Sequence, residues 1–288
     1  MQVIDLCFQQ IPGSIACFFF PDLGVLVETG PHSTLPHLKR GLIKIGHSLE
    51  DVKHVLLSHI HLDHAGAAWC WRDRDTQIYV HPAGYPHLKN PEKLWHSAQR
   101  IYGDKMQDLW GDMKAIPAEK LVAVEDQEQI IHSSFTAHHT PGHAQHHIAW
   151  QWEDIIFTGD VAGVCIDQGP VIAPCPPPDL SPEAWLASID KIARLKPKEL
   201  MLTHYGPIQE PEKHLKDLKE SLHTLEAWMR KAFKKSDNPQ DIISAFEEYT
   251  QNLIQKRNLS SKGLEKYLAA NPPWMSVYGW LRYLKKET

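Results

Sequence analysis

Residues 58–66 read SHIHLDHAG and place three histidines and one aspartate within six positions. The stretch overlaps the end of an apolar run, HVLLSH at residues 54–59, which resembles a strand buried on both faces. His59 and His61 at the end of such a strand would point the same way, and Asp63 and His64 would lie on the turn beyond. A solvated turn and a set of helix caps are the alternatives to a metal site. Imidazole and carboxylate suit zinc, iron and manganese, and the spacing allows one ion for each pair.

Two ions need more ligands than this stretch offers, and further candidates follow three later apolar segments. His143 comes after a Thr-Pro-Gly turn, Asp160 ends the segment IIFTGD, and His204 ends LMLTH. Each position resembles the carboxyl end of a strand, which is where open α/β sheets present ligands. The sequence therefore predicts that these side chains join the histidine-rich stretch in one metal centre.

The order of strand-like and helix-like segments indicates an α/β fold. Strands and a helix alternate over the first 80 residues, and residues 83–115 read as a helical insertion. After more strands and a proline-rich loop, a helix is expected to begin with Ser181 as N-cap and Pro182 in its first turn. From residue 211 the pattern is all helical. We therefore expect a catalytic domain at 1–210 and a C-terminal helical region at 211–288.

An apolar stripe runs along the first helix of the C-terminal region. Its members recur at spacings of three and four: Leu215, Leu218, Leu222, Leu225 and Met229. The stripe spans only about two heptads, which favours packing against the protein's own core over a coiled coil. A homodimer through this face is the alternative.

Composition narrows the class of protein. The 288 residues are 42% hydrophobic and 23% charged, as in an ordinary folded domain, and the net charge of −5 gives no reason to expect a nucleic-acid partner. The five cysteines include no C-x-x-C pair, which argues against a disulfide framework or a thiolate zinc site. The N-terminal stretch has no basic leader and no apolar run approaches the length of a membrane span, so we expect a cytoplasmic protein without membrane contact.

The four segments together resemble the metallo-β-lactamase-fold hydrolases, in the branch with glyoxalase II and lactonases. The matching motifs are H-x-H-x-D-H at 59–64, T-P-G-H at 140–143, G-D at 159–160 and T-H at 203–204. In addition, GVLVETG at residues 24–30 stands where that family often has a strand ending in D-T-G. The resemblance covers residues 1–210. It implies an αββα sandwich of two mixed β-sheets flanked by helices.

The resemblance also implies which side chain serves which ion. His59, His61 and His143 correspond to the ligands of one metal. Those of the second correspond to Asp63, His64 and His204, with Asp160 bridging both. The implied cofactor is two divalent ions per chain, with zinc expected and iron or manganese as alternatives.

The implied reaction is hydrolysis. Two cations that share a carboxylate can hold a hydroxide at neutral pH, because a bound metal lowers the pKa of water to about 7. That hydroxide would attack the carbonyl of an ester, lactone or thioester, and Asp63 would act as a catalytic residue that aims it. Alternatives with the same fold are a mononuclear iron persulfide dioxygenase and a phosphodiesterase. The helical tail shows no match to the basic residues with which glyoxalase II holds glutathione.

Candidates for the walls of a substrate pocket are aromatic residues and one loop. The loop is 169–179, and the aromatic side chains suit a small acyl or apolar substrate: Tyr85, Trp95, Tyr102, Trp110, Trp274 and Tyr278. His139 and His147 flank the Thr-Pro-Gly-His motif and are candidates for orienting ligands or lining the pocket. The other histidines, His81 and His146 among them, are expected to have surface or core roles.

Overall fold

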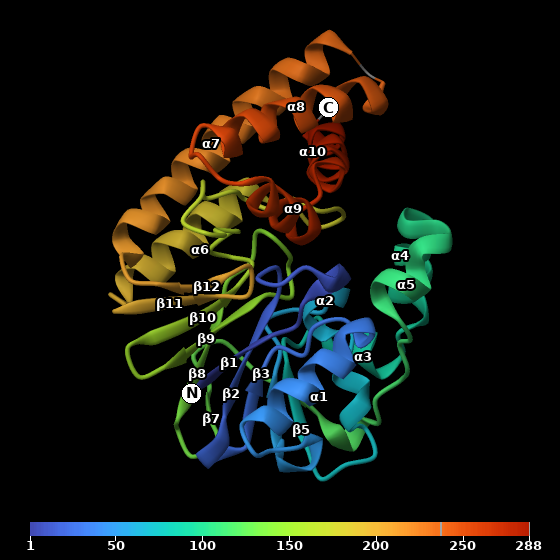
Figure 1. The fold of residues 1–288 in the computed structure, drawn as a ribbon, viewed down its shortest axis with the longest axis vertical. Helices are drawn as coiled ribbons and strands as arrows, with labels where there is room; N and C mark the ends of the chain where they lie inside the picture. Colours follow the sequence, from blue (N-terminus) through green and yellow to red (C-terminus); the bar gives the residue numbers. More distant parts are fainter. Residues whose placement is uncertain (237, 288) are drawn as a thin grey trace. The chain divides into compact units, whose positions relative to one another are not determined.

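The computed structural model describes residues 1–236 and 238–287, and within them two six-stranded β-sheets form the centre of the fold (Figure 1). The strand order of the first sheet is β1-β2-β3-β4-β5-β6, and that of the second is β12-β11-β10-β9-β8-β7. Helices flank the sheets, and the chain after β12 is helical. This confirms the predicted αββα architecture with a helical C-terminal region.

The first sheet is mixed. β1 to β3 pair antiparallel, and β3 to β6 pair parallel. Every residue of β2 and β3 is buried, because their apolar sequences ACFFF and VLV face other protein on both sides. The strands are β1 (Gln2–Asp5), β2 (Ala16–Phe20), β3 (Val25–Val27), β4 (His54–Leu56), β5 (Gln77–Val80) and β6 (Leu121–Ala123).

The second sheet is also mixed. β7 to β9 pair antiparallel, β10 and β11 pair parallel, and β11 and β12 pair antiparallel. Its strands are β7 (Gln129–Ile130), β8 (Phe135–His139), β9 (Ile148–Trp152), β10 (Ile155–Gly159), β11 (Glu199–Leu202) and β12 (Gly206–Ile208).

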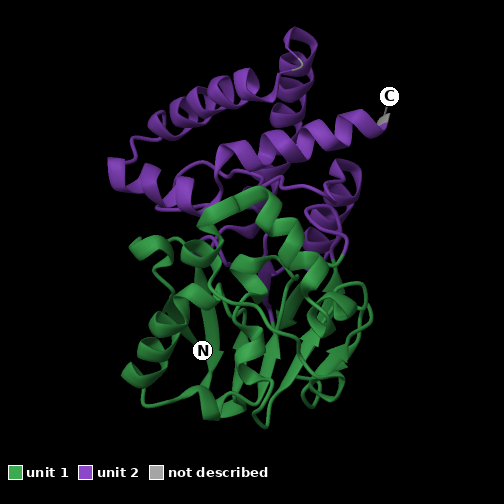
Figure 2. Ribbon diagram, turned by 90° about the vertical axis from the view of Figure 1, so that its right-hand side faces the viewer, with its two compact units in different colours: residues 1–139, 146–153 green, residues 140–145, 154–288 purple. Residues whose placement is uncertain are grey.

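The described part of the chain folds into two compact units (Figure 2). The first contains residues 1–139 and 146–153, and the second contains 140–145 and the described residues from 154 onward. In the first unit, aromatic rings join the two sheets. The Phe20 ring of β2 lies 5.2 Å from that of Phe135 on β8 and 5.0 Å from that of Trp152 on β9. Such edge-to-face pairs stabilise the sandwich beyond their burial.

The helices of the first unit include the predicted helical insertion. α1 contacts β1, and three short helices occupy the segment 83–115. These helices are α1 (Leu35–Lys44), α2 (Leu62–Ala65), α3 (Tyr85–Lys89), α4 (Glu92–Tyr102) and α5 (Met106–Trp110).

The second unit contains the longer helices. They are α6 (Pro182–Arg194), α7 (Pro211–Lys235), α8 (Pro239–Gln255), α9 (Ser261–Ala270) and α10 (Pro273–Glu287). Ser181 is the N-cap residue of α6 and Pro182 follows it, as predicted. The Ser181 side chain, however, accepts no capping hydrogen bond from the described residues.

The apolar stripe of α7 packs within its own unit. Its five members are 0–4% exposed, and α7 contacts α6 and α10. The interpretation that this stripe belongs to the protein's own core is confirmed. In the described residues, no helix has both the length and the apolar character required to cross a bilayer.

Candidate metal centre

The histidine-rich stretch begins where β4 leaves the first sheet. The strand ends at Leu56, so it is shorter than the apolar run suggested. The next carbonyl groups accept hydrogen bonds from β9 instead: Leu57 O from Trp150 Nε1 at 3.0 Å, and Ser58 O from the Ile148 N–H at 2.7 Å. The backbone immediately before the first candidate ligand is therefore held between two sheets.

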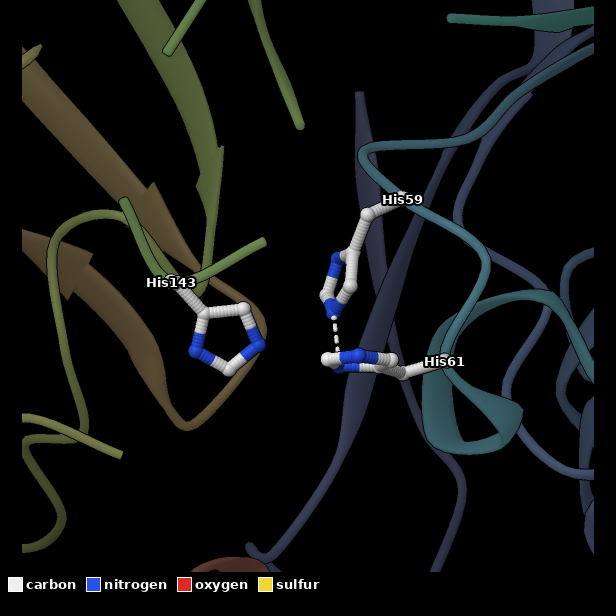
Figure 3. A group of neighbouring side chains, drawn as sticks. All are labelled: His59, His61 and His143. Atoms are coloured by element: carbon white, nitrogen blue, oxygen red, sulfur yellow. Dashed lines mark hydrogen bonds between the residues drawn. The ribbon is translucent and has the colours of Figure 1, made fainter. Parts of the chain in front are cut away.

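His59 and His61 face one another across a short gap (Figure 3). His59 Nε2 and His61 Nδ1 are 2.8 Å apart, and the two ring planes are nearly perpendicular at 78°. His59 is fully buried and His61 is half-buried at the N-cap of α2. Two ring nitrogens directed at one small volume form the arrangement that two ligands of one ion require.

Asp63 and His64 lie on the short helix α2. His64 is fully buried, and its Nε2 is 3.6 Å from Asp63 Oδ2. The Asp63 side chain keeps 21% exposure, so its carboxylate is open to solvent or a small molecule. The pair thus offers a nitrogen and an oxygen donor side by side.

A buried glutamate that the sequence analysis gave no role lies beside these histidines. Glu28 is 1% exposed; its Oε1 accepts the Ser58 N–H at 3.2 Å, and its Oε2 is 3.5 Å from His64 Nδ1. The Ser58 Oγ is 2.9 Å from His59 Nδ1 and 3.4 Å from His64 Nδ1. The negative charge of Glu28 at ion-pair distance from His64 Nδ1 favours the tautomer that carries its proton on Nδ1, which leaves Nε2 of His64 as the metal-binding nitrogen. The sequence feature that could have pointed to Glu28 is an acidic residue at the end of an apolar strand.

In the second unit, His143 is held on both sides of its ring. Its Nδ1 donates to Pro174 O at 2.9 Å, and its Nε2 is 3.3 Å from Asp160 Oδ2. Gly142 precedes it with a φ of 140°, and a Cβ there would lie 2.3 Å from the Cα of Trp185. Only glycine allows the turn to pack this closely on α6, so the Thr-Pro-Gly motif positions the histidine.

Asp160 and His204 follow β10 and β11, two parallel neighbours in the second sheet. Asp160 Oδ1 is 3.4 Å from His204 Nε2, while Oδ2 faces His143. Asp160 is 3% exposed and His204 is fully buried. One carboxylate therefore presents one oxygen to each of two imidazoles, which is the geometry that a bridging ligand needs.

The seven predicted ligands form two groups. Within each group, all ligand atoms lie within 4.8 Å of one another. The first group, drawn in Figure 3, is His59, His61 and His143, and the second is Asp63, His64, Asp160 and His204. The donor set fits zinc, iron or manganese, because it consists of imidazole and carboxylate only. The hydrogen bonds to Nδ1 of His59 and His143 also fit, because they direct Nε2 toward an ion.

The two histidines proposed to orient ligands have different surroundings. His147 is fully buried with its ring 5.0 Å from that of His59. His139 instead stacks on His81 at 4.1 Å, and its Nε2 donates to Val124 O at 2.9 Å. The neighbouring His146, which we expected only in a surface or core role, has its ring 5.6 Å from that of His61.

Two predicted wall residues of the first unit contact one another at the ends of α4 and α5, and a third, Tyr85, lies on α3. The ring of Trp110 stacks on Phe8 at 5.3 Å and meets Tyr102 at 5.0 Å. Burial, and next the charge of Asp63, raise the pKa of the Tyr102 hydroxyl. Tyr102 is thus an electrostatic neighbour of a candidate ligand, whereas the Tyr85 hydroxyl donates to Ala118 O at 3.4 Å.

The remaining wall candidates lie on α4 and α10. Trp95 on α4 is half-buried. In the second unit, the rings of Trp274 and Tyr278 on α10 are 6.2 Å apart, and Tyr278 is 40% exposed. Contact of these aromatic residues with a substrate stays a prediction.

Comparison with known proteins identifies the family. The sequence model of the metallo-beta-lactamase superfamily matches residues 12–204, and the chain belongs to this superfamily. One relative is the metallo-beta-lactamase fold-containing protein ST1585 of Sulfurisphaera tokodaii, 29% identical over 182 residues, which are 59% of this chain and 67% of that protein. Members of the superfamily are generally hydrolases.

Solved structures share the fold at low sequence identity. The structure of ST1585 from Sulfolobus tokodaii aligns over 100% of this chain and 98% of its own, with a TM-score of 0.68 and 20% identity. The metallo-beta-lactamase family protein TTHA1429 from Thermus thermophilus covers 96% of this chain and 89% of its own, with a TM-score of 0.63 and 19% identity. MEM-A1, a subclass B3 metallo-beta-lactamase from a soil metagenome library, covers 74% of this chain and 88% of its own, with a TM-score of 0.52 and 20% identity.

Proposed function

We propose that this protein is a dinuclear metal-dependent hydrolase of carboxylic esters, lactones or thioesters. The observation that supports the proposal best is the double contact of Asp160, which faces His143 with one oxygen and His204 with the other. A buried carboxylate between two buried imidazoles is costly without a cation to balance it. Two divalent ions, zinc in the first instance, would satisfy all seven donors.

Some residues of the chain would bind the ions, and others would act in catalysis. Bound ions would supply a water acidified to a pKa of about 7 and would polarise a carbonyl oxygen. His59, His61 and His143 would hold the first ion. Asp160 would serve both, and the second ion would take its other ligands from the second group.

Asp63 has a second role in this proposal. Its side chain keeps 21% exposure, so a water molecule can reach the carboxylate. It would accept a hydrogen bond from the attacking water and so aim the water's lone pair at the carbonyl carbon. The nearby Tyr102 hydroxyl, whose pKa burial raises further above neutrality, would stay protonated and would donate to the substrate.

The substrate class rests on the character of the predicted walls. Tyr102 is close enough to Asp63 to respond to its charge, and the buried Trp110 packs on Tyr102. Aromatic side chains suit an acyl or apolar substrate better than a highly charged one. A small-molecule substrate is therefore proposed over a nucleic acid.

The test is a panel of substrates with matched variants. Zinc-loaded protein should hydrolyse p-nitrophenyl acetate, a γ-lactone or an acyl thioester, lose the activity with a chelator and regain it with zinc. Asp160→Asn should abolish the activity, whereas Asp154→Asn, which removes only an exposed ion pair with Lys198, should keep it.

Two other results would redirect the assignment. Turnover of bis(p-nitrophenyl) phosphate without turnover of any carboxylic ester would support a phosphodiesterase. One iron per chain with oxygen uptake on a persulfide would support the dioxygenase.

A further inference from the structure

The segment between β10 and α6, residues 161–180, contacts two candidate ligands through its backbone; we name it the ligand-support loop. Pro174 O accepts the hydrogen bond from His143 Nδ1 at 2.9 Å. Cys165 N–H donates to His204 O at 2.7 Å, and Cys165 O accepts the Tyr205 N–H at 3.4 Å. One loop therefore orients the ring of one ligand and fixes the backbone of another.

The C-terminal helix α9 holds the first half of this loop. The Tyr267 hydroxyl accepts the Ile166 N–H at 3.0 Å and donates to Pro170 O at 2.7 Å. Tyr267 is 1% exposed, so water does not compete for these bonds. A single hydroxyl thus joins two points of the loop to α9.

Apolar packing supports the same contact. The Tyr267 ring belongs to a buried cluster with Val164, Ile166 and Ile172 of the loop and Ile254 of α8. Val164 and Ile172 also pair as a β-bridge. The loop is consequently packed on α8 and α9 as well as hydrogen-bonded to α9.

Helix α10 holds the second half of the loop. Ser276 Oγ accepts the Cys175 N–H at 3.2 Å, next to the carbonyl that orients His143. A Cβ on Gly279 would lie 1.9 Å from Cys175 O, so the helix and the loop touch backbone to backbone. This approach requires glycine at position 279 and leaves Cys175 little freedom to move.

We propose that α9 and α10 are a built-in support for the metal ligands, with Tyr267 and Ser276 as positioning residues. The C-terminal helical region would then set metal affinity through the ligand-support loop, without supplying a ligand itself. This inference rests on the proposed function, because it takes His143 and His204 as ligands. Side chains that act through packed and hydrogen-bonded neighbours change binding by roughly 3- to 30-fold.

The first test compares two tyrosines of the C-terminal region. Tyr267→Phe removes only the hydroxyl that joins α9 to the loop. Tyr283→Phe is the matched control, because the Tyr283 hydroxyl donates to Glu183 on α6 at 2.6 Å, outside the loop. Zinc affinity, measured by competition with a chromophoric chelator, should fall roughly 3- to 30-fold in Tyr267→Phe and stay within about twofold in the control.

A spectroscopic readout separates positioning from general stability. The visible absorption of cobalt bound in place of zinc reports ligand geometry, and it should change in Tyr267→Phe but not in Tyr283→Phe. Gly279→Ala places a methyl group against the Cys175 carbonyl and should change the same absorption bands. Alanine has a higher helix propensity than glycine, so the substitution does not weaken α10 itself. Wild-type zinc affinity and wild-type cobalt spectra in both Tyr267→Phe and Gly279→Ala would overturn the inference.

The failure of the proposed function gives a different result. If the unmodified protein binds neither zinc nor cobalt, the metal centre itself is wrong and the inference is overturned with it. If the unmodified protein binds both ions and Tyr267→Phe and Gly279→Ala bind them equally well with unchanged spectra, the metal centre stands and the support role does not.

Discussion

Replacing Glu28 by glutamine tests how the buried carboxylate prepares a metal ligand. The wild-type Oε2 lies 3.5 Å from His64 Nδ1, and Oε1 accepts the Ser58 N–H at 3.2 Å. Glutamine keeps the size and one acceptor oxygen but places an NH₂ donor beside the other position. If the oxygen stays with Ser58, the amide faces Nδ1 and favours the tautomer whose Nε2 carries the proton. That tautomer cannot bind an ion through Nε2.

The expected loss follows from the role of such partners in known metal sites. Mutating a side chain that lies against a metal-ligating histidine and sets its tautomer weakens metal affinity by about 10- to 100-fold, which is about 1.4–2.7 kcal/mol. Zinc titration against a chromophoric chelator measures this directly. Glu50→Gln is the control, because Glu50 forms an exposed ion pair with Arg74 and has no contact with the candidate ligands.

Stability provides a second readout of the same variant. Neutralising a buried carboxylate removes a desolvation cost that only a cation or charged partner offsets. The metal-free Glu28→Gln protein should therefore unfold at the same denaturant concentration as wild type or at a higher one. Wild-type zinc affinity in Glu28→Gln, or a large loss of metal-free stability, would refute the assignment of Glu28 to His64.

Three further predictions concern separate parts of the fold. Asp63→Ala should lower the rate of ester hydrolysis by about 10²- to 10⁴-fold, and full activity with full metal content would remove Asp63 from the mechanism. Gly142→Ala should lower the free energy of unfolding by about 1–3 kcal/mol, because its Cβ would lie 2.3 Å from Trp185 Cα; unchanged denaturant unfolding would contradict the close approach. Burial and then His139 lower the pKa of His81 from 6.5 to about 4, so the unfolded chain binds more protons and stability falls as the pH drops from 6.5 toward 4. His81→Asn should flatten that decline in pH-dependent unfolding, and an unchanged slope would disprove it.

The order of segments predicts an α/β fold, the family resemblance implies the αββα sandwich, and the candidate ligands stand out as local sequence patterns. Four of the seven donors are visible within the six residues of H-x-H-x-D-H, and the other three follow later strand-like segments. The start of α6 at Ser181 and Pro182 and the buried stripe of α7 follow in the same way from neighbouring residues.

Features that join distant segments could not be predicted in this way. Glu28 and Ser58 are 30 residues apart, and Tyr267 meets Ile166 across 101 residues. The early end of β4 has a similar cause, because the carbonyls of residues 57 and 58 bond to β9 rather than continuing the first sheet. Tertiary contacts of this kind override a local apolar pattern.

The metal content of the purified protein tests the central claim most directly. The protein is loaded with zinc, separated from excess ion by gel filtration and analysed by elemental mass spectrometry. It should carry about two zinc ions per chain, as in other sites with two metals. Asp160→Asn, which removes the carboxylate that faces His143 and His204, should carry fewer. A wild-type protein that retains no metal, or a variant that retains as much as wild type, would contradict the account.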